Sequence, residues 1–462
     1  MKKIYAVLSV LLLLTVLTVG MYSLLDKDET FSTSENRALK SRPKLTFSTL
    51  LNGKYAEDFG AYFADTFPNR EKLMSANRSL NGFYYFSGLS GENDVQLSVG
   101  FQSGGAHGGE ALKPTDAPTA EPTDGNDRES DAPEPSVSAE PTEPPAPTEY
   151  QGGTTDAEVE DLGQAILIGN RAMDVPYGNY DLIEKYAEAV TAIGDALGSG
   201  VQTFNIAVPN AAEFYTPKEY HTGDRSQVSM IDHCYKHLGE NIISVDAYSN
   251  LAQHTEEYIY FRTDHHWTQL GAYYAYTAFC KAAGMQPRAI EEFETGEYTG
   301  FIGSMYTYLS GYPQSQILAN DPDTLYFYRP VVEAKARYYS DTTLSDEGVI
   351  GVISYIESSV NNKYLTYVGG DHPVVVVKTD VANDKVCLLI KESYGNAFLP
   401  WLTSHYSKIV MIDPREFNRD GQPKLDLAEF AAEQGVTDCI VLNYPMMLNS
   451  EAYISYLNAM VK

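Results

Sequence analysis

A short apolar run at residues 386–390 constrains the fold of this chain more strongly than any other feature. It contains no polar position, which is typical of a strand that is buried on both faces of a sheet. Helical apolar patterns and other short apolar runs alternate along the chain on either side of it. Because strands that alternate with helices pair in parallel and are covered on both faces, we predict an α/β fold with a doubly wound parallel sheet flanked by helices.

The individual elements follow from the same patterns. We predict helices over residues 180–197, 228–238, 269–283 and 425–434 and near Phe398, and strands over residues 165–169, 201–208, 242–245, 386–390, 409–412 and 439–442. Residues 320–380 are rich in Tyr, Val and Thr between turn residues, which predicts a β-rich insertion.

An uncharged run at residues 4–25 follows Lys2 and Lys3 at the start of the chain. Its 22 residues are enough for a helix to cross a bilayer core of ~30 Å. The lysines before it and the acidic residues after it favour an amino terminus in the cytoplasm. We therefore predict that residues 1–29 form a single-pass transmembrane signal anchor with its flanks, and that the rest of the chain is extracytoplasmic. The alternative is a cleaved signal and a secreted protein, but the run is long for a signal and no Ala-x-Ala site closes it.

Residues 104–161 have a different composition, with nine prolines and fifteen acidic against two basic residues. Such a segment buries too little apolar surface to offset the entropy lost on ordering, so we predict a disordered acidic, Pro-rich linker. It either tethers a separate domain or interrupts a hairpin within one domain. The strand predicted directly after it, at residues 165–169, favours the interruption.

Charge and cysteines exclude several classes of protein. The formal net charge of -29 argues against a nucleic-acid partner, because phosphate binding depends on clustered Lys and Arg. The four cysteines permit a disulfide in an oxidising compartment, but Cys280, Cys387 and Cys439 lie in apolar patterns that favour buried free thiols. The chain contains no Cys-x-x-Cys zinc motif.

The segment DHHW at residues 264–267 brings catalytic residue types together between a β-like run at residues 258–261 and a helical pattern. Asp264 and His266 are two residues apart, so in an extended or turn conformation they project to the same side. A carboxylate in that position can orient an imidazole and stabilise its protonated form. We predict that they are the orienting acid and the base of a triad.

Ser393 is the candidate nucleophile, because it follows the run at residues 386–390 almost directly and precedes a helical segment. A turn from strand to helix exposes a hydroxyl, while amides at the start of the helix can stabilise an oxyanion. The alternative is that Ser393 only caps the helix.

Two segments together resemble a known family. They are TDHHWT at residues 263–268, with Gly271-Ala272-Tyr273 after it, and KESYGN at residues 391–396, followed by Pro400. Both are similar to motifs of the DHHW proteins, which belong to the SGNH-hydrolase-like O-acetyltransferases together with the alginate O-acetylation proteins.

The resemblance implies an SGNH-hydrolase-like sheet and carries a Ser-His-Asp triad onto Ser393, His266 and Asp264. One departure is Glu392, since the family often has Asp before the serine. The resemblance also implies a division of the chain. Residues 30–103 are the N-terminal part of the domain, residues 104–161 are an insertion at a hairpin tip, and residues 162–462 are the main part.

The resemblance implies an O-acyltransferase or esterase that acts on hydroxyls of cell-envelope polysaccharide or exopolysaccharide through an acyl-enzyme. A polysaccharide or glycan would be the acceptor, and a membrane-bound O-acyltransferase would supply the acyl group. We expect no cofactor and no metal.

Further residues are candidates for binding. The amides of Tyr394 and Gly395, or of the Gly369-Gly370 turn, are predicted oxyanion donors, and Asn396 is a substrate-binding candidate.

Three other residues have alternative readings. Trp267 is either a platform for a sugar ring or, because it begins an apolar helical set, part of the core. His265 points away from its neighbour and is expected to make a structural hydrogen bond. Ser304 is the rival nucleophile.

Two other functions remain open. The first is a catalytically inactive envelope protein that binds a glycan or a partner. The second is a metal-dependent phosphoesterase, which needs several hard ligands for each of two ions. His233 and His237 have helical spacing, but no carboxylate partner is evident from the sequence.

Overall fold

The computed structural model describes residues 31–32, 37–38, 42–44, 54–55, 59, 62–63, 158–162, 165–310, 312–358, 360–418 and 423–461. The predicted membrane anchor, and the linker except for its last four residues, lie outside these ranges and stay predictions. None of the helices within these ranges combines the length and the apolar character needed to cross a bilayer.

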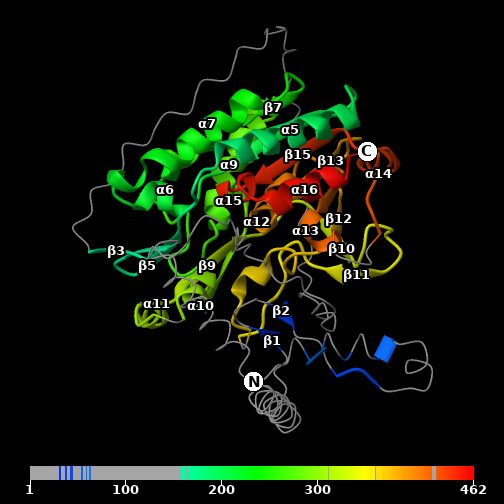
Figure 1. The fold of residues 1–462 in the computed structure, drawn as a ribbon. Helices are drawn as coiled ribbons and strands as arrows, with labels where there is room; N and C mark the ends of the chain where they lie inside the picture. Colours follow the sequence, from blue (N-terminus) through cyan, green and yellow to red (C-terminus); the bar gives the residue numbers. More distant parts are fainter. Residues whose placement is uncertain are drawn as a thin grey trace, which may run out of the picture.

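One sheet of eight strands forms the centre of the described structure (Figure 1). Its spatial order is β11 (Glu347–Ile350), β10 (Ala334–Tyr339), β12 (Val374–Thr379), β14 (Lys408–Ile412), β13 (Val386–Lys391), β15 (Asp438–Asn443), β6 (Gln202–Ala207) and β7 (Ile242–Ser244). The last five strands are parallel, as predicted, whereas β10, β11 and β12 pair antiparallel. The predicted parallel sheet is therefore part of a mixed sheet, because three strands of the predicted β-rich insertion extend it in antiparallel pairing.

Helices cover both faces of the sheet, as β6 demonstrates. Neighbouring residues of a strand point to opposite faces. Asn205 donates a hydrogen bond to the hydroxyl of Tyr186 on α5 (Tyr180–Leu197), whereas the ring of Phe204 meets Phe279 on α9 (Gln269–Ala282). The helices α7 (Gln227–His237), α14 (Leu427–Gln434) and α16 (Glu451–Ala459) pack on α5, and α8 (Ala247–Ala252) and α12 (Tyr394–Leu402) pack on α9.

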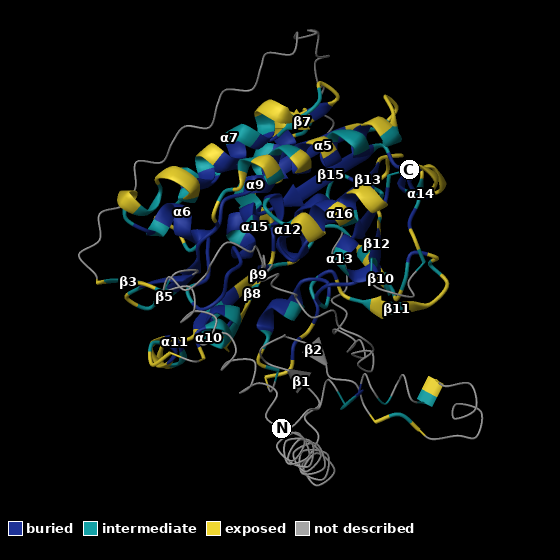
Figure 2. Cartoon of the chain, viewed as in Figure 1, coloured by how far each residue is buried: buried dark blue, intermediate teal, exposed yellow. Residues whose placement is uncertain are grey.

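The helix α5 begins and ends where the sequence predicts. The side chain of Asn179 accepts a hydrogen bond from the amide of Leu182, and Gly198 ends the helix with a φ of 73°. Its apolar stripe, which includes Ile183, is buried, and each large apolar side chain buried in this way contributes about 1.5–3 kcal/mol. Figure 2 shows the consequence, with buried residues along the sheet and exposed residues on the outer faces of the helices.

Smaller elements complete the described structure. They are the three-stranded sheet β3 (Val159–Asp161), β4 (Ala165–Ile168) and β5 (Arg171–Asp174), the pair β8 (Thr295–Phe301) and β9 (Asp323–Tyr328), the pair β1 (Phe31–Ser32) and β2 (Arg37–Ala38), and the short helices α6 (Ala211–Tyr215), α10 (Ser304–Tyr308), α11 (Ser315–Asn320), α13 (Pro414–Phe417) and α15 (Pro445–Leu448). The strand β3 lies within residues 104–161, so regular structure begins slightly earlier than predicted, because pairing with β4 satisfies its backbone. All four cysteines are buried free thiols, as the sequence favours for Cys280, Cys387 and Cys439.

Candidate active site

Ser393 lies between the last residue of β13, Lys391, and the first residue of α12, Tyr394. It is at the carboxyl edge of the parallel strands, where α/β folds bind ligands. Its hydroxyl makes no capping hydrogen bond to α12, which argues against the alternative of a simple helix cap. Instead, its Oγ lies 2.7 Å from Nε2 of His266.

Asp264 and His266 lie in a tight loop rather than after a strand. The prediction of a β-like segment at residues 258–261 is wrong, because these residues form no strand and only Tyr260 makes an isolated bridge, to Trp267. Within the loop, Oδ1 of Asp264 accepts a hydrogen bond of 3.0 Å from the amide of His266 and lies 2.5 Å from Nδ1 of the same ring. Contacts within the loop itself thus orient the imidazole, without residues that are distant in the sequence.

Two other strands hold this loop in place. Oδ2 of Asp323, on β9, accepts hydrogen bonds from the amide and the hydroxyl of Thr263, at 2.8 and 2.7 Å. Arg171, on β5, donates a hydrogen bond of 2.9 Å to the carbonyl of Phe261. Charge-assisted hydrogen bonds of this kind contribute about 1.5–3 kcal/mol each, so the loop is well fixed.

The second oxygen of Asp264 accepts a hydrogen bond of 2.8 Å from the amide of Ser304, the first residue of α10. Burial on its own raises the pKa of this carboxyl. The charge of His266, its hydrogen bond and the amide of Ser304 outweigh burial and hold the pKa of Asp264 well below its usual range. Asp264 is therefore ionised and can stabilise a protonated His266.

The prediction that His265 points away from His266 is wrong, because the tight loop brings the two rings together, with centroids 3.8 Å apart. His265 nevertheless hydrogen-bonds to a different partner. Its Nδ1 lies 2.5 Å from Oγ of Ser304, and burial together with the neighbouring His266 lowers its pKa to about 3. A ring that stays neutral and is held in this way has a structural part, as the sequence suggests. Since Ser304 contacts His265 rather than His266, its position favours a supporting part over that of the rival nucleophile.

The predicted oxyanion donors near the serine are mostly occupied. The amide of Tyr394 donates to Oε2 of Glu392 at 3.0 Å, and the amide of Gly395 donates to the carbonyl of Glu392 at 2.8 Å. The amide of Gly370 donates to the carbonyl of Tyr367 at 3.0 Å. These three amides are therefore unsuitable as donors in this conformation, because local hydrogen bonds already occupy them.

Two amides are not used in this way. Within the described residues, the backbone N–H of Ser393 and that of Gly369 donate no hydrogen bond. Gly369 has a φ of 72°, and a Cβ at this position would overlap Ile350, so the turn requires glycine.

Trp267 and Asn396 belong to the scaffold. The indole N–H of Trp267 donates a hydrogen bond of 3.0 Å to the carbonyl of Tyr394, and its ring is fully buried. The side-chain amide of Asn396 donates to Oδ1 of Asp371 at 2.8 Å. Trp267 thus lies in the core, which favours the core interpretation over a sugar platform. The substrate-binding role of Asn396, whose Oδ1 has no hydrogen-bond partner among the described residues, stays a prediction.

A buried ionic network beneath the serine was not foreseen. Nζ of Lys391 lies 2.8 Å from Oδ1 of Asp371 and 3.0 Å from Oδ2 of Asp413. Arg415 contacts the same two carboxylates, at 3.0 and 2.6 Å. The network ties the ends of β13 and β14 to the segment before β12, and so fixes the turn that carries Ser393.

Glu392 is a further residue that sequence reasoning missed. It is fully buried, and burial raises its pKa to about 7 in spite of the nearby Arg415 charge. Its Oε2 lies 3.3 Å from Oγ of Ser393, while Oε1 has no partner. The only signal in the sequence was the departure from the aspartate that is common at this position.

Metal-binding arrangements are limited to two groups within the described residues. One is Asp264 with His265 and His266, in which both nitrogens of His266 already bond to Asp264 and Ser393. The other consists of Glu184 on α5 with His233 and His237 on α7, two helices that carry no residue of the triad. Since a two-metal phosphoesterase needs adjacent ion sites, the described geometry does not support that alternative.

Several known proteins are similar to this chain in sequence or in fold. The profile of the family "DHHW protein" matches residues 125–412, well over half of the chain. A DHHW family protein from Eubacterium siraeum is 29% identical with a TM-score of 0.58, covering 67% of this chain and 99% of its own. Bacillus cereus PatB1, solved with a sulfonyl adduct, is 16% identical with a TM-score of 0.50, covering 63% and 98%. The O-acetyltransferase domain of Pseudomonas putida AlgJ is 14% identical with a TM-score of 0.36, covering 64% and 96%.

No curated protein sequence matches significantly. The chain belongs to the DHHW family.

Proposed function

We propose that this protein is a membrane-anchored, extracytoplasmic O-acyltransferase or esterase that acts on hydroxyls of cell-envelope polysaccharide or exopolysaccharide. The observation that carries the proposal is the continuous chain of contacts from Ser393 Oγ to His266 Nε2, at 2.7 Å, and from His266 Nδ1 to Asp264 Oδ1, at 2.5 Å. The first distance falls in the range of roughly 2.6–3.2 Å expected of a nucleophile and its base, and the second, between the base and its orienting carboxylate, is slightly shorter.

The reaction would proceed through an acyl-enzyme. Oγ of Ser393 attacks the carbonyl carbon of the acyl donor and gives its proton to Nε2 of His266, which returns it to the leaving oxygen. A sugar hydroxyl, or water, then attacks the acyl-serine, gives its proton to His266 and restores the serine hydroxyl. Asp264 keeps the other proton of the ring on Nδ1 throughout and stabilises the imidazolium.

The amides of Ser393 and Gly369 are our candidates for the oxyanion donors. Both are free of other hydrogen bonds within the described residues, unlike the amides of Tyr394, Gly395 and Gly370. An amide that is unpaired in the resting enzyme loses no existing bond when the oxyanion forms.

The anchor and the partners complete the proposal. Residues 4–25 would hold the domain on the outer side of the membrane, where envelope glycans are the available acceptors. The acyl group would come from a membrane-bound O-acyltransferase.

A serine-directed reagent tests the proposal. The full-length chain, purified in detergent, is treated with a sulfonyl fluoride or a fluorophosphonate and its intact mass is recorded. PatB1 carries a sulfonyl adduct in its solved structure, which supports this choice of reagent. We expect one adduct in the native chain, none in Ser393→Ala and slower labelling in His266→Ala. Ser304→Ala is the matched control and should label at nearly the native rate.

The opposite result is equally clear. If the native chain never gains mass with either reagent or with an activated acetyl ester, or if Ser393→Ala labels as fast as the native chain, the proposed nucleophile is wrong. The result would then favour an inactive envelope protein that binds a glycan or a partner. The acetyl-enzyme formed from the activated acetyl ester separates a transferase from an esterase. Added oligosaccharide should accelerate its breakdown in a transferase and leave the rate unchanged in an esterase.

A further inference from the structure

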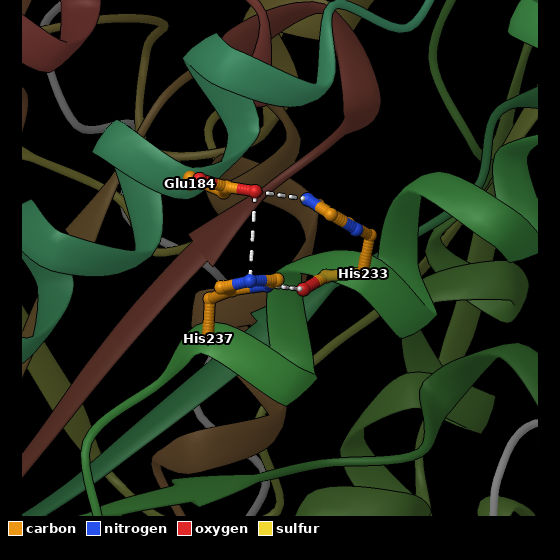
Figure 3. A group of neighbouring side chains, drawn as sticks. All are labelled: Glu184, His233 and His237. Carbon is orange, nitrogen blue, oxygen red and sulfur yellow. Dashed lines mark hydrogen bonds and ion pairs between the residues drawn. The ribbon is translucent and has the colours of Figure 1, made fainter.

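Three side chains from two helices converge on the surface of the protein (Figure 3). Oε1 of Glu184, on α5, lies 3.0 Å from Nε2 of His233 and 3.5 Å from Nε2 of His237, both on α7. The two histidines are four residues apart, so they share one face of the helix, and their ring centroids are 4.3 Å apart. The ligand atoms of all three residues lie within 4.8 Å of one another.

The hydrogen bond of His237 determines which of its nitrogens is free. Its Nδ1 lies 2.8 Å from the backbone carbonyl of His233. A carbonyl oxygen only accepts, so Nδ1 carries the hydrogen and, in the neutral ring, Nε2 presents a lone pair. That lone pair faces the carboxylate of Glu184, and two electron pairs in this arrangement repel unless a proton or a metal ion lies between them. A backbone carbonyl that fixes the tautomer is also the usual companion of a metal-bound histidine.

We propose that Glu184, His233 and His237 bind a divalent transition-metal ion, with Zn²⁺ as the preferred ion. Two imidazoles and a carboxylate form a ligand set that zinc accepts, leaving a fourth position for water or another ligand. With bonds of about 2.0–2.1 Å, tetrahedral ligand atoms are about 3.3 Å apart, close to the separations of 3.0 and 3.5 Å seen here.

Such an ion would join α5 to α7, which pack together over the same face of the sheet. The site is open to solvent, since the side chains of His233, His237 and Glu184 retain 25%, 41% and 45% of their exposure. It shares no residue with the triad, so the inference does not depend on the proposed function. Sequence alone did not reveal it because Glu184 lies 49 positions before His233.

Zinc binding by the full-length chain tests the inference. The protein, purified without a histidine tag and freed of metal with a chelator, is titrated with Zn²⁺ in competition with a chromophoric chelator. His233→Ala, His237→Ala and Glu184→Gln are compared with His254→Ala. His254 is similarly exposed and pairs with Glu257 at 2.8 Å, but lacks a second imidazole at helical spacing, which makes it a matched control.

We expect the native chain and His254→Ala to bind one equivalent of Zn²⁺ with equal affinity and to melt at a higher temperature when Zn²⁺ is present. Each of the three ligand variants should bind at least about tenfold more weakly, since even indirect partners of a metal site contribute 10–100-fold. Because all three side chains are partly exposed, the variants should fold normally, which far-ultraviolet circular dichroism checks.

Two results would overturn the inference. One is a native chain that takes no zinc from the competing chelator. The other is undiminished affinity in any one of the three ligand variants, including Glu184→Gln, because the residue concerned would then not be a ligand.

Discussion

The ring of Tyr364 lies face to face with the ring of His266, with centroids 3.9 Å apart and an angle of 12° between the planes. The same tyrosine donates a hydrogen bond of 3.0 Å from its hydroxyl to the carbonyl of Ser393. One side chain thus contacts the proposed base through its face and the proposed nucleophile through its hydroxyl. A protonated imidazole over an aromatic face is attracted to the ring, so the stack favours the state that follows proton transfer.

Two substitutions of Tyr364 should separate these contacts. Tyr364→Phe keeps the ring and loses the hydroxyl bond, so we expect about 1 kcal/mol less stability and a labelling rate within about tenfold of native. Tyr364→Ala also loses the stack, worth about 2 kcal/mol when desolvated, so labelling should slow by a further factor of roughly 30. The rate of adduct formation with a fluorophosphonate is the measurement. Equal rates for the two variants would contradict a role for the stack.

Gly303 is required by the close approach of Asp264. A Cβ at this position would overlap the side chain of Asp264, although the backbone conformation itself suits any residue. We expect Gly303→Ala to displace the carboxylate and slow labelling by roughly 100-fold, the usual cost of a catalytic group misplaced by about 1 Å. Gly200→Ala, where a Cβ meets open space, is the control and should label at the native rate. A fully active Gly303→Ala protein would show that Asp264 need not stay where it is.

Glu392 should make stability depend on pH. Its folded-state pKa of about 7 lies above the usual 4.5, so between these values the folded protein keeps a proton that the unfolded chain has lost. The contribution of this group to the free energy of unfolding is therefore fully present below about pH 4.5 and is lost by about pH 7, a change of roughly 3 kcal/mol.

Glu392→Gln removes that dependence. Urea unfolding at pH 4.5, 6.0 and 7.5 should show the variant gaining stability relative to the native chain as pH rises, because every other titrating group is common to both. Glu294→Gln, whose side chain is 79% exposed, should show no such gain. A constant difference between Glu392→Gln and native protein at the three pH values would rule out the burial effect.

The sequence predicted those parts of the fold that local patterns determine. Apolar residues recur with a helical period over residues 180–197, and α5 has these bounds. In the structure Asn179 caps its start and Gly198 its end. The antiparallel pairing of β10 and β12 could not be predicted in this way, because β propensity shows that a segment is extended but not which strand it pairs with.

In the candidate site, too, the features that depend on local sequence could be predicted and those that depend on the folded structure could not. Asp264 and His266 were recognisable because their spacing of two positions is a local property, and Ser393 because it follows a buried strand. The stack of Tyr364 on His266 depends on tertiary structure, whereas the use of the Tyr394 amide by Glu392 is a local contact that the spacing alone does not specify. The family resemblance could not supply the latter, since Glu392 is where this chain departs from it.

The buried ammonium of Lys391 should be the most sensitive position beneath the serine. Burial alone lowers the pKa of a lysine, but the carboxylates of Asp371 and Asp413 outweigh it and raise the pKa, so Lys391 is charged. In Lys391→Met, the two buried carboxylates pair with the guanidinium of Arg415 alone. We expect a loss of roughly 3–5 kcal/mol in the free energy of unfolding by urea. Lys335→Met, at a lysine that is 81% exposed although it pairs with a glutamate at 2.8 Å, should change stability far less, because solvent screens an exposed ion pair. If the two variants lose equal stability, the network does not support the turn that carries the serine.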